Sequence, residues 1–493
     1  MQTIRFRNYR CFKDTGYIEL KPLTFLVGAN SSGKSSFLKF FPLMRQSFGR
    51  PRSGTFLWSF KDVDFQNLKN ILSDTSSDMS VEFTIERPLG VKNGKVWKNS
   101  LDTTVNVCFQ LGLKENGFDY LHYFSLEYFD QKIEVTLNEK GKCERICIND
   151  KLDVVEYEKF IHVTDTNVLL PNIRFGKKNT IFTSQSPFAQ EEVFKIINEH
   201  TAGVEKPFKL LNRICDKKGH IEDFKACGID LSEGEANKAN DLLVLFHIND
   251  IIDVVNVHLI GMICNMTYIG PIRAKAKREY NIQNWAIDEI ESDGNNIAMF
   301  LFNLEEEKRQ DFQTWLKDNF SINLDIHTVG HYVELLLSIG DGDFVNIIDL
   351  GFGYSQILPI LVSIWYSMHF SKTPQMMDVL NQSIHHYVVI EQPELHLHPR
   401  MQSDFADVLV NVLNSCKSIN RDIHFIIETH SQALLNRIGT QIYKERLKQE
   451  DVNVLLFNAS AEEMGDKYVE QAMFSEDGFL ENWPIGFFSG NAD

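Results

Sequence analysis

The chain reads Lys21-Pro-Leu-Thr-Phe-Leu-Val27, then Gly28-Ala-Asn-Ser-Ser-Gly-Lys-Ser35, then Ser36-Phe-Leu-Lys-Phe-Phe41. An apolar strand, a G-x-x-x-x-G-K-S loop and a helix follow one another here, in the context that a phosphate-binding loop requires. The two glycines let the backbone approach a phosphate, and successive N–H groups meet the positive end of the following helix. Lys34 is expected to reach the β- and γ-phosphates of a nucleotide, and the Ser35 hydroxyl to bind Mg²⁺. The residues expected to contact the phosphates are Gly28, Asn30, Ser31, Ser32, Gly33, Lys34, Ser35 and Ser36.

Composition and charge exclude several classes of protein. The 493 residues carry 50 Lys and Arg against 67 Asp and Glu, a net charge of −17, which disfavours broad coating of DNA. With 43% hydrophobic and 24% charged residues the chain is globular, with room for two or three folding units. The apolar run Ile357–Phe370 is too short to cross a bilayer, and the N-terminus has no secretory pattern, so we expect a cytoplasmic protein without membrane spans. The 8 cysteines include no Cys-x-x-Cys pair, which argues against a zinc ribbon or a disulfide framework.

Three further motifs lie in the last third of the chain. The apolar run Tyr387–Ile390 ends in Glu391-Gln-Pro-Glu394, which puts an acidic residue where a phosphate-loop ATPase keeps its magnesium carboxylate. A second apolar run, Ile423–Ile427, leads into Glu428-Thr-His-Ser431, which puts His430 at the ligand-binding edge of a parallel sheet. The segment Asp349–Pro359 places two glycines and a serine before a predicted helix, another phosphate-facing helix start.

In this order the motifs resemble the ABC-type ATPases of the RecF/SMC/OLD-like group, and in particular stand-alone bacterial AAA ATPases without a Toprim domain. The resemblance implies an α/β fold, an ABC-type ATPase head of mixed sheets that is interrupted by a β-plus-helical insertion. It implies ATP and Mg²⁺ as cofactors, a switch role for His430, and a signature segment that contacts the nucleotide held by a second copy of the chain. The signature residues are Gly351, Gly353, Ser355 and Gln356. The implied assembly is therefore a homodimer or a higher oligomer.

The residue after the metal carboxylate departs from the usual ABC pattern. A glutamate normally polarises the attacking water there, whereas this chain has Gln392, which orients water but cannot accept its proton in the same way. Glu394 is expected to assist, and turnover to be slow. The predicted catalytic residues are Gln392, Glu394 and His430, and the predicted magnesium contacts are Ser35, Gln66 and Glu391.

Several residues keep alternative interpretations. Tyr9, Arg10 or Phe12, in a predicted edge strand, pack either on adenine or in the core. His396 and His398 lie either in a metal site or, as the resemblance favours, beside a dimer interface. The basic segment Tyr268–Arg278 contacts nucleotide or subunit, forms a solvated face, or lines a nucleic-acid groove.

We expect three parts: 1–85, the first part of the ATPase head; 86–265, an insertion; and 266–493, the rest of the head. The insertion is predicted to begin as a meander of strands at Thr103–Gln110, Tyr120–Tyr128, Lys132–Thr136 and Glu144–Ile148. Its longest predicted helix is Gly234–Met266. No sustained heptads are present, and the 63 residues after His430 are too few for a Toprim nuclease domain.

The resemblance extends to ATPase subunits of anti-phage defence systems such as PARIS and Septu. It implies an oligomeric sensor or scaffold that hydrolyses ATP slowly and controls a separately encoded effector, a nuclease, in response to a phage trigger protein. The alternative is a RecF/SMC-like DNA-binding ATPase of DNA repair or recombination. Binding of nucleic acid is not favoured.

Overall fold

The computed structural model describes residues 1–48, 52–86, 90–92, 95–97, 104–128, 130–154, 160–163, 169–176, 184–200, 224–225, 229–283, 289–370, 385–419, 421–458 and 468–482. The chain divides into two compact units. Unit 1 comprises Met1–Tyr17, Ser47–Phe60 and Asp64–Ile260, and unit 2 comprises Ile18–Gln46, Lys61–Val63 and Gly261–Asp493. Both units combine helices with sheets, which confirms the mixed α/β class. The predicted boundaries after residues 85 and 265 stay predictions.

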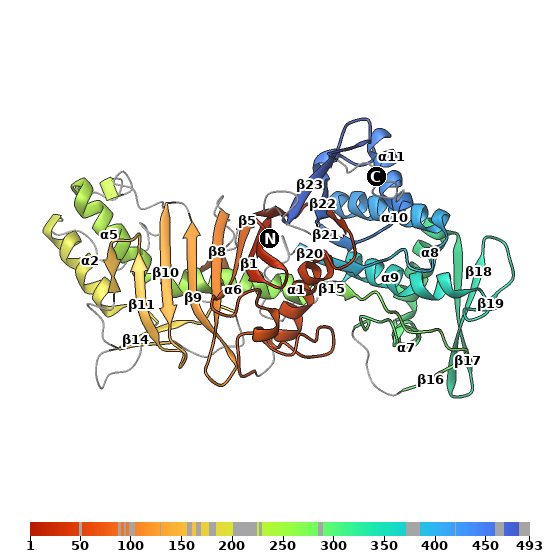
Figure 1. The fold of residues 1–493 in the computed structure, drawn as a ribbon, viewed down its shortest axis with the longest axis horizontal. Coiled ribbons are helices and arrows are strands. Elements are labelled where there is room, and N and C mark those ends of the chain that lie inside the picture. Colours follow the sequence, from red (N-terminus) through yellow and green to blue (C-terminus); the bar gives the residue numbers. More distant parts are fainter. Residues whose placement is uncertain are drawn as a thin grey trace. The chain divides into compact units, whose positions relative to one another are not determined.

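Unit 1 is built on an antiparallel sheet with the strand order β12-β11-β10-β9-β8-β5-β1-β2 (Figure 1). Its strands are β1 Thr3–Tyr9, β2 Phe12–Asp14, β5 Met79–Glu86, β8 Thr104–Leu113, β9 Asp119–Tyr128, β10 Gln131–Leu137, β11 Cys143–Ile148 and β12 Leu152–Asp153. The predicted meander is confirmed, because β8 to β11 pair in sequence order. In β8 buried residues alternate with more exposed ones, as in a strand with one face buried.

The strand β1 is not an edge strand, so that prediction is wrong. After a turn the chain folds back as β2, which pairs with β1 on the side away from β5. Tyr9 and Phe12 are fully buried, with ring centroids 6.5 Å apart. Both rings therefore belong to the core, as one of the two interpretations had it.

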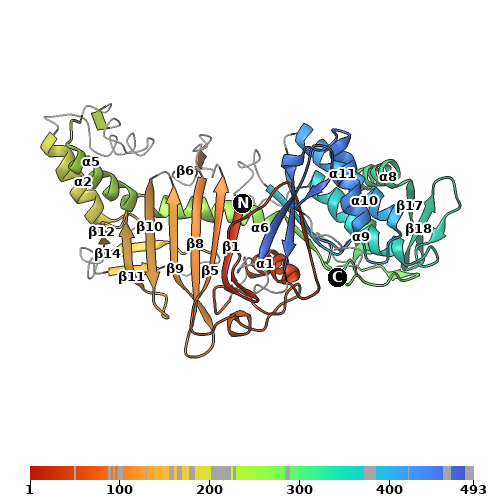
Figure 2. The same ribbon diagram turned by 45° about the horizontal axis from the view of Figure 1, so that its top comes forward.

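The remaining elements of unit 1 are short strands, a 3₁₀ turn and helices. They are η1 Leu68–Ile71, β6 Gly90–Lys92, β7 Lys95–Trp97, β13 Phe160–Val163, β14 Ile173–Gly176, α2 Pro187–His200, α5 Glu233–Phe246 and α6 Ile248–Cys264. Helices α2 and α5 pack against each other, and α5 also contacts β11 (Figure 2). The predicted single helix Gly234–Met266 is wrong, because α5 and α6 are separate and bent by 53°. His247 leaves helical geometry between them, and its Nδ1 lies 2.7 Å from Asp250 Oδ2 in the first turn of α6.

No single helix among the described residues is long and apolar enough to span a membrane; α5 and α6 meet that length and composition only as a bent pair.

Unit 2 contains the sheet that positions the candidate site. Its strand order is β15-β20-β21-β4-β22-β23-β24, parallel from β15 to β22 and antiparallel beyond. These strands are β4 Leu23–Gly28, β15 Met266–Ile269, β20 His385–Glu391, β21 Asp422–Glu428, β22 Val452–Phe457, β23 Val469–Phe474 and β24 Leu480–Glu481. Every residue of β4 is buried, as in a central parallel strand covered on both faces. The carboxyl ends of β4, β20 and β21 consequently lie along one edge.

The other elements of unit 2 include a smaller sheet of order β16-β18-β17, in which β19 pairs with β18. They are β3 Ile18–Glu19, α1 Lys34–Ser47, β16 Tyr280–Asn281, α7 Ile297–Asn303, α8 Glu306–Phe320, β17 Ile322–Val329, β18 Tyr332–Ile339, β19 Val345–Asn346, α9 Phe352–His369, α10 Pro399–Ser418, α11 Gln432–Tyr443 and η4 Gln449–Asp451. Helix α9 contacts β20 and α10 contacts β21. Val388, Ile390, Phe425 and Ile427 share one buried cluster with Trp365 of α9, so this face of the sheet is the core of the unit.

Candidate nucleotide site

The loop after β4 has the backbone geometry of an anion cradle. Gly28 ends β4 with a φ of 151°, and a Cβ there would lie 2.3 Å from the Phe457 carbonyl oxygen of the paired strand β22. Gly33, with a φ of 102°, leads into α1, whose first residue is Lys34. Only glycine fits at position 28. The helix amino terminus that follows directs N–H groups toward the loop, which suits a phosphate.

Lys34 lies inside this loop. Its Nζ donates to the carbonyl oxygens of Gly28, at 3.0 Å, and Ala29, at 2.7 Å, and the residue is only 3% exposed. Burial lowers the pKa of Lys34, while the charges of Glu428 and Glu394 act in the opposite direction. The predicted phosphate-binding ammonium is therefore held at the centre of the cradle. Of the remaining loop residues, Asn30 and Ser31 are exposed, Ser32 is buried, and Ser36 is half-buried in α1.

Two glutamates end the neighbouring strands β20 and β21. Glu391 and Glu428 are register partners. The Ser35 hydroxyl donates to Glu428 Oε2 at 2.8 Å, and the Tyr268 hydroxyl of β15 donates to Glu391 Oε1 at 2.7 Å. Burial raises the pKa of both carboxyl groups, that of Glu391 to about 7. These hydroxyl and carboxylate oxygens are the donors that Mg²⁺ prefers, so the set fits that ion.

Gln392 has an unusual backbone that its neighbours hold in place. Its φ is 45°, a left-handed conformation that is costly for a residue other than glycine. Its N–H donates to the Glu428 carbonyl at 2.8 Å. Arg273 Nη2 donates to the carbonyl oxygens of Glu391, at 2.9 Å, and Gln392, at 3.2 Å. These hydrogen bonds from Arg273 stabilise the loop that carries the predicted catalytic Gln392.

Glu394 connects this loop to the segment after β21. Its Oε2 accepts from the Thr429 hydroxyl at 2.9 Å, and its Oε1 accepts from the His430 N–H at 2.6 Å. Burial raises its pKa, and the same hydrogen bonds oppose that rise. Because both carboxylate oxygens accept bonds from the switch segment, Glu394 positions His430.

His430 has the properties of a phosphate sensor. Burial lowers its pKa, and the charge of Lys34 lowers it further, so the neutral imidazole dominates near pH 7. Its Nε2 is buried and has no hydrogen-bond partner within the described ranges. A buried, unsatisfied ring nitrogen costs free energy unless a ligand supplies the partner. This nitrogen is therefore the second feature, after the glycine cradle, that fits a bound phosphate.

The signature segment begins α9. Gly351, with a φ of 94°, precedes the helix and is exposed, as is Phe352 at 44%. Gly353 packs against the turn after β20, where an added Cβ would lie 3.1 Å from the His396 carbonyl oxygen. Ser355 and Gln356 are buried, and the Ser355 hydroxyl donates to the Phe352 carbonyl at 2.8 Å. The exposed part of the signature is thus the helix start, and the contact predicted for the Ser355 hydroxyl stays a prediction.

The roles predicted for Gln66, His396 and His398 stay predictions. Gln66 belongs to unit 1, where its side chain accepts from Asn70 Nδ2 at 2.8 Å, so its role as a magnesium contact stays a prediction. His396 and His398 belong to no group of three metal-ligand side chains in the described part of the chain.

The two arginines of the basic segment Tyr268–Arg278 make contacts within unit 2. Arg273 is 4% exposed, and burial lowers its pKa to about 10. Arg278 forms a two-pronged ion pair with Asp349 at 2.7 and 2.9 Å. The two arginines of the segment are therefore engaged with acidic or carbonyl groups, which weakens its interpretation as a nucleic-acid groove.

Sequence reasoning gave Glu428 no role at this edge, and it named Tyr268 and Arg273 only as members of the basic segment. Glu428 is the last residue of β21 as Glu391 is the last residue of β20, and that repeated position was the available signal. Tyr268 lies on β15, opposite Val389 of β20, and so shares a face with Glu391. Nothing local in the sequence marks Arg273 as buried.

The chain is similar to a known protein family and to solved structures. A family model described as an AAA ATPase domain matches residues 1–435. No curated protein matches the chain. Among solved structures, the SMC head domain from Thermotoga maritima matches at 11% identity and a TM-score of 0.35, over 96% of this chain and 98% of that chain. The Smc head domain from Pyrococcus furiosus, with an extended coiled coil and bound to the C-terminal domain of ScpA, matches at 11% identity and a TM-score of 0.35, over 96% of each chain. TM-scores this low do not establish a shared fold.

Proposed function

Because the chain belongs to the family of AAA ATPase domains, we propose that it binds Mg²⁺-ATP at the loop and strand ends of unit 2 and hydrolyses it slowly. The observation that carries the proposal is the hydrogen bond from Ser35 Oγ to Glu428 Oε2, 2.8 Å long. It joins the first turn of α1 to the acidic strand ends across 393 residues of sequence. In phosphate-loop ATPases a magnesium ion lies between these two elements.

The residues divide the chemical work. Lys34 and the N–H groups of the loop hold the phosphates, and Ser35, Glu391 and Glu428 supply oxygen ligands for Mg²⁺, which neutralises charge on the phosphate oxygens. Gln392 orients the attacking water, and the free Nε2 of His430 contacts the γ-phosphate.

Slow turnover follows from the surroundings of the two candidate bases. Gln392 has no basic oxygen that takes up a proton at neutral pH. Glu394 uses both oxygens to accept bonds from Thr429 and His430. Neither side chain is free to act as a strong general base, so hydrolysis is suited to timing a switch rather than to bulk turnover.

We propose that the chain acts as a homodimer or higher oligomer. The exposed start of α9, with Gly351 and Phe352 at its surface, supports a contact made in trans to a nucleotide on another copy. In this arrangement Gly353 and Ser355 approach the γ-phosphate of the partner site. ATP favours the closed assembly only through contacts that the open form lacks.

The biological role that we propose is a sensor or scaffold that controls a separate effector, a nuclease, in anti-phage defence, with a phage protein as trigger. The motif resemblance is its support. The rival role, a RecF/SMC-like DNA-binding ATPase, requires an accessible basic groove, and the buried Arg273 and paired Arg278 speak against the basic segment as that groove. DNA affinity that falls steeply with salt would favour the rival.

The ATPase proposal is tested with Glu391→Ala, Gln392→Ala and Glu394→Ala, each assayed for ATP binding and for hydrolysis with and without Mg²⁺. We expect Glu391→Ala to lose magnesium-dependent hydrolysis and the other two to slow it while ATP still binds. The matched control is Glu470→Ala on β23, outside the site. Hydrolysis at the wild-type rate in all three site variants would overturn the assignment.

A further inference from the structure

A second cluster of ligand-type side chains lies at the opposite ends of the same strands. His385 is the first residue of β20, and Asp422 is the first residue of β21. His385 and Asp422 are register partners, and His424 lies two residues further along β21 on the same face as Asp422. Glu391 ends β20 six residues after His385, so the cluster is roughly 20 Å from the nucleotide edge, at about 3.3 Å per residue.

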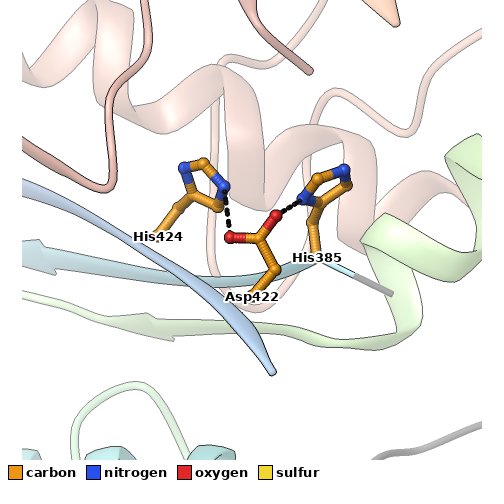
Figure 3. Close-up of side chains that lie close together, drawn as sticks. All are labelled: His385, Asp422 and His424. Carbon is orange, nitrogen blue, oxygen red and sulfur yellow. Dashed lines mark ion pairs between the residues drawn. The ribbon is translucent and has the colours of Figure 1, made fainter. Parts of the chain in front are cut away.

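The three side chains converge on one point (Figure 3). Asp422 lies between the two imidazoles, with Oδ2 2.6 Å from His385 Nδ1 and Oδ1 3.1 Å from His424 Nε2. One ligand atom from each residue lies within 4.8 Å of the other two. Ligands of a tetrahedral Zn²⁺ ion, bound at about 2.0 to 2.3 Å, are separated by comparable distances.

The surroundings of the cluster favour a cation over a simple hydrogen-bonded network. His424 is 8% exposed, and neither of its ring nitrogens makes a well-directed hydrogen bond to the described residues. Its ring stacks on Tyr387, at 5.1 Å between centroids and 18° between planes, which fixes its orientation. Its Nε2 therefore approaches the carboxylate as a second metal ligand does, without donating to it.

The carboxylate of Asp422 is paired with two imidazoles. Among the described residues, no Lys or Arg forms an ion pair with Asp422. The adjacent Arg421 instead donates to the carbonyl oxygens of Met368 and His369. The Asp422 side chain is 47% exposed, so an ion can enter from solvent.

We infer that His385, Asp422 and His424 form a binding site for a Zn²⁺-type transition-metal ion that links the amino-terminal ends of β20 and β21. Two imidazole nitrogens and one carboxylate oxygen suit Zn²⁺, whereas Mg²⁺ prefers oxygen ligands alone. Three protein ligands leave a fourth position for water or a further ligand. The ion clamps the two strands whose other ends carry Glu391 and Glu428, and so stabilises the sheet under the nucleotide site.

The test measures metal binding by the full chain, purified without a histidine tag and stripped with a chelator. We expect about one Zn²⁺ per chain to survive dialysis, and Co²⁺ in its place to give the visible absorption of a low-coordinate nitrogen and oxygen site. Asp422→Asn and His424→Gln should each weaken Zn²⁺ binding by about 10-fold or more. Added Zn²⁺ should raise the melting temperature of the wild type and leave that of the variants unchanged.

Two controls separate this site from general histidine binding and from misfolding. His386→Gln changes the neighbouring residue, whose side chain lies on the other face of β20, and His327→Gln changes an exposed residue of β17. Both should keep the Zn²⁺ affinity of the wild type. ATP binding at Lys34 reports whether each variant is folded, because Lys34 is not one of the proposed zinc ligands. No Zn²⁺ retained by the wild type, or equal retention by folded Asp422→Asn and His424→Gln, would overturn the inference.

Discussion

Glu391 and Glu428 end neighbouring parallel strands, yet their partners give them different chemistry. Glu428 accepts from Ser35, the hydroxyl expected on Mg²⁺, whereas Glu391 accepts from Tyr268, and burial raises its pKa to about 7. The carboxylate nearest the phosphate loop is therefore Glu428, although the strand pattern points first to Glu391. Both residues face the same side of the sheet because each is an even number of positions from the strand start.

Glu428→Gln keeps the size of the side chain and removes its charge. We expect magnesium-dependent ATP hydrolysis to fall by about 10- to 100-fold, as for groups that bind or orient a metal ligand. Steady-state phosphate release over a Mg²⁺ titration measures the effect. The control is Glu470→Gln on β23, outside the site, which should leave hydrolysis near the wild-type rate. Equal rates in Glu428→Gln and the wild type would leave Glu428 without a role.

The raised pKa of Glu391 predicts that the stability of the metal-free protein depends on pH. Burial raises its pKa from 4.5 to about 7, so the folded state binds this proton more tightly than the unfolded state. The stabilisation is complete below the unfolded pKa and is lost as pH rises through the folded pKa. The melting temperature of the wild type should therefore fall between about pH 5 and 8 more steeply than that of Glu391→Gln. Parallel curves for the two proteins would contradict the shifted pKa.

At the scale of elements, the turn from β4 into α1 depends on Gly28. Gly28→Ala puts a Cβ 2.3 Å from the Phe457 carbonyl oxygen at a φ of 151°, so β4 and β22 must separate or the loop must move. Because this change distorts the phosphate loop, we expect ATP affinity to fall by about 10-fold or more. A tenfold fall corresponds to a loss of about 1.4 kcal/mol of binding free energy. Isothermal titration with ATP measures it.

The matched control for this glycine is Gly261→Ala in α6, where nothing lies within 4 Å of the added Cβ. Alanine is favoured over glycine inside a helix by about 1 kcal/mol, so this variant should melt at or above the wild-type temperature and bind ATP unchanged. Loss of ATP affinity in both variants would show that the effect is not local to the loop.

The sequence predicted those elements whose signal is local. The strand β4 and the buried parts of β20 and β21 follow from continuous apolar runs, and the meander β8 to β11 follows from alternation and turn residues. The break at His247 was missed because apolar residues keep helical spacing through it. Glu428 was missed because its proposed role depends on its hydrogen bond with Ser35, which lies 393 residues away in the sequence. Contacts of that range are set by strand order, which local patterns do not encode.

At the scale of the whole molecule, the composite site that we propose needs two copies of the chain. In that proposal one chain supplies Lys34 within the phosphate loop, and another supplies the start of α9. Ser355 is a poor position for a disruptive change because it is buried. Phe352 is 44% exposed in the first turn of α9, where an acidic residue is compatible with the helix. Phe352→Asp should therefore fold and yet repel the phosphates of a partner site.

Mixing two inactive variants distinguishes sites built in trans from sites built in cis. Lys34→Ala and Phe352→Asp should each lack hydrolysis alone. In a dimer of one copy of each, one site combines both defects and the other combines the intact loop of one copy with the intact α9 of its partner. Random pairing of equal amounts makes half of the dimers mixed, so about a quarter of wild-type activity should return. If both elements served the nucleotide of their own chain, every site in the mixture would carry a defect and hydrolysis would stay at the background of the separate variants.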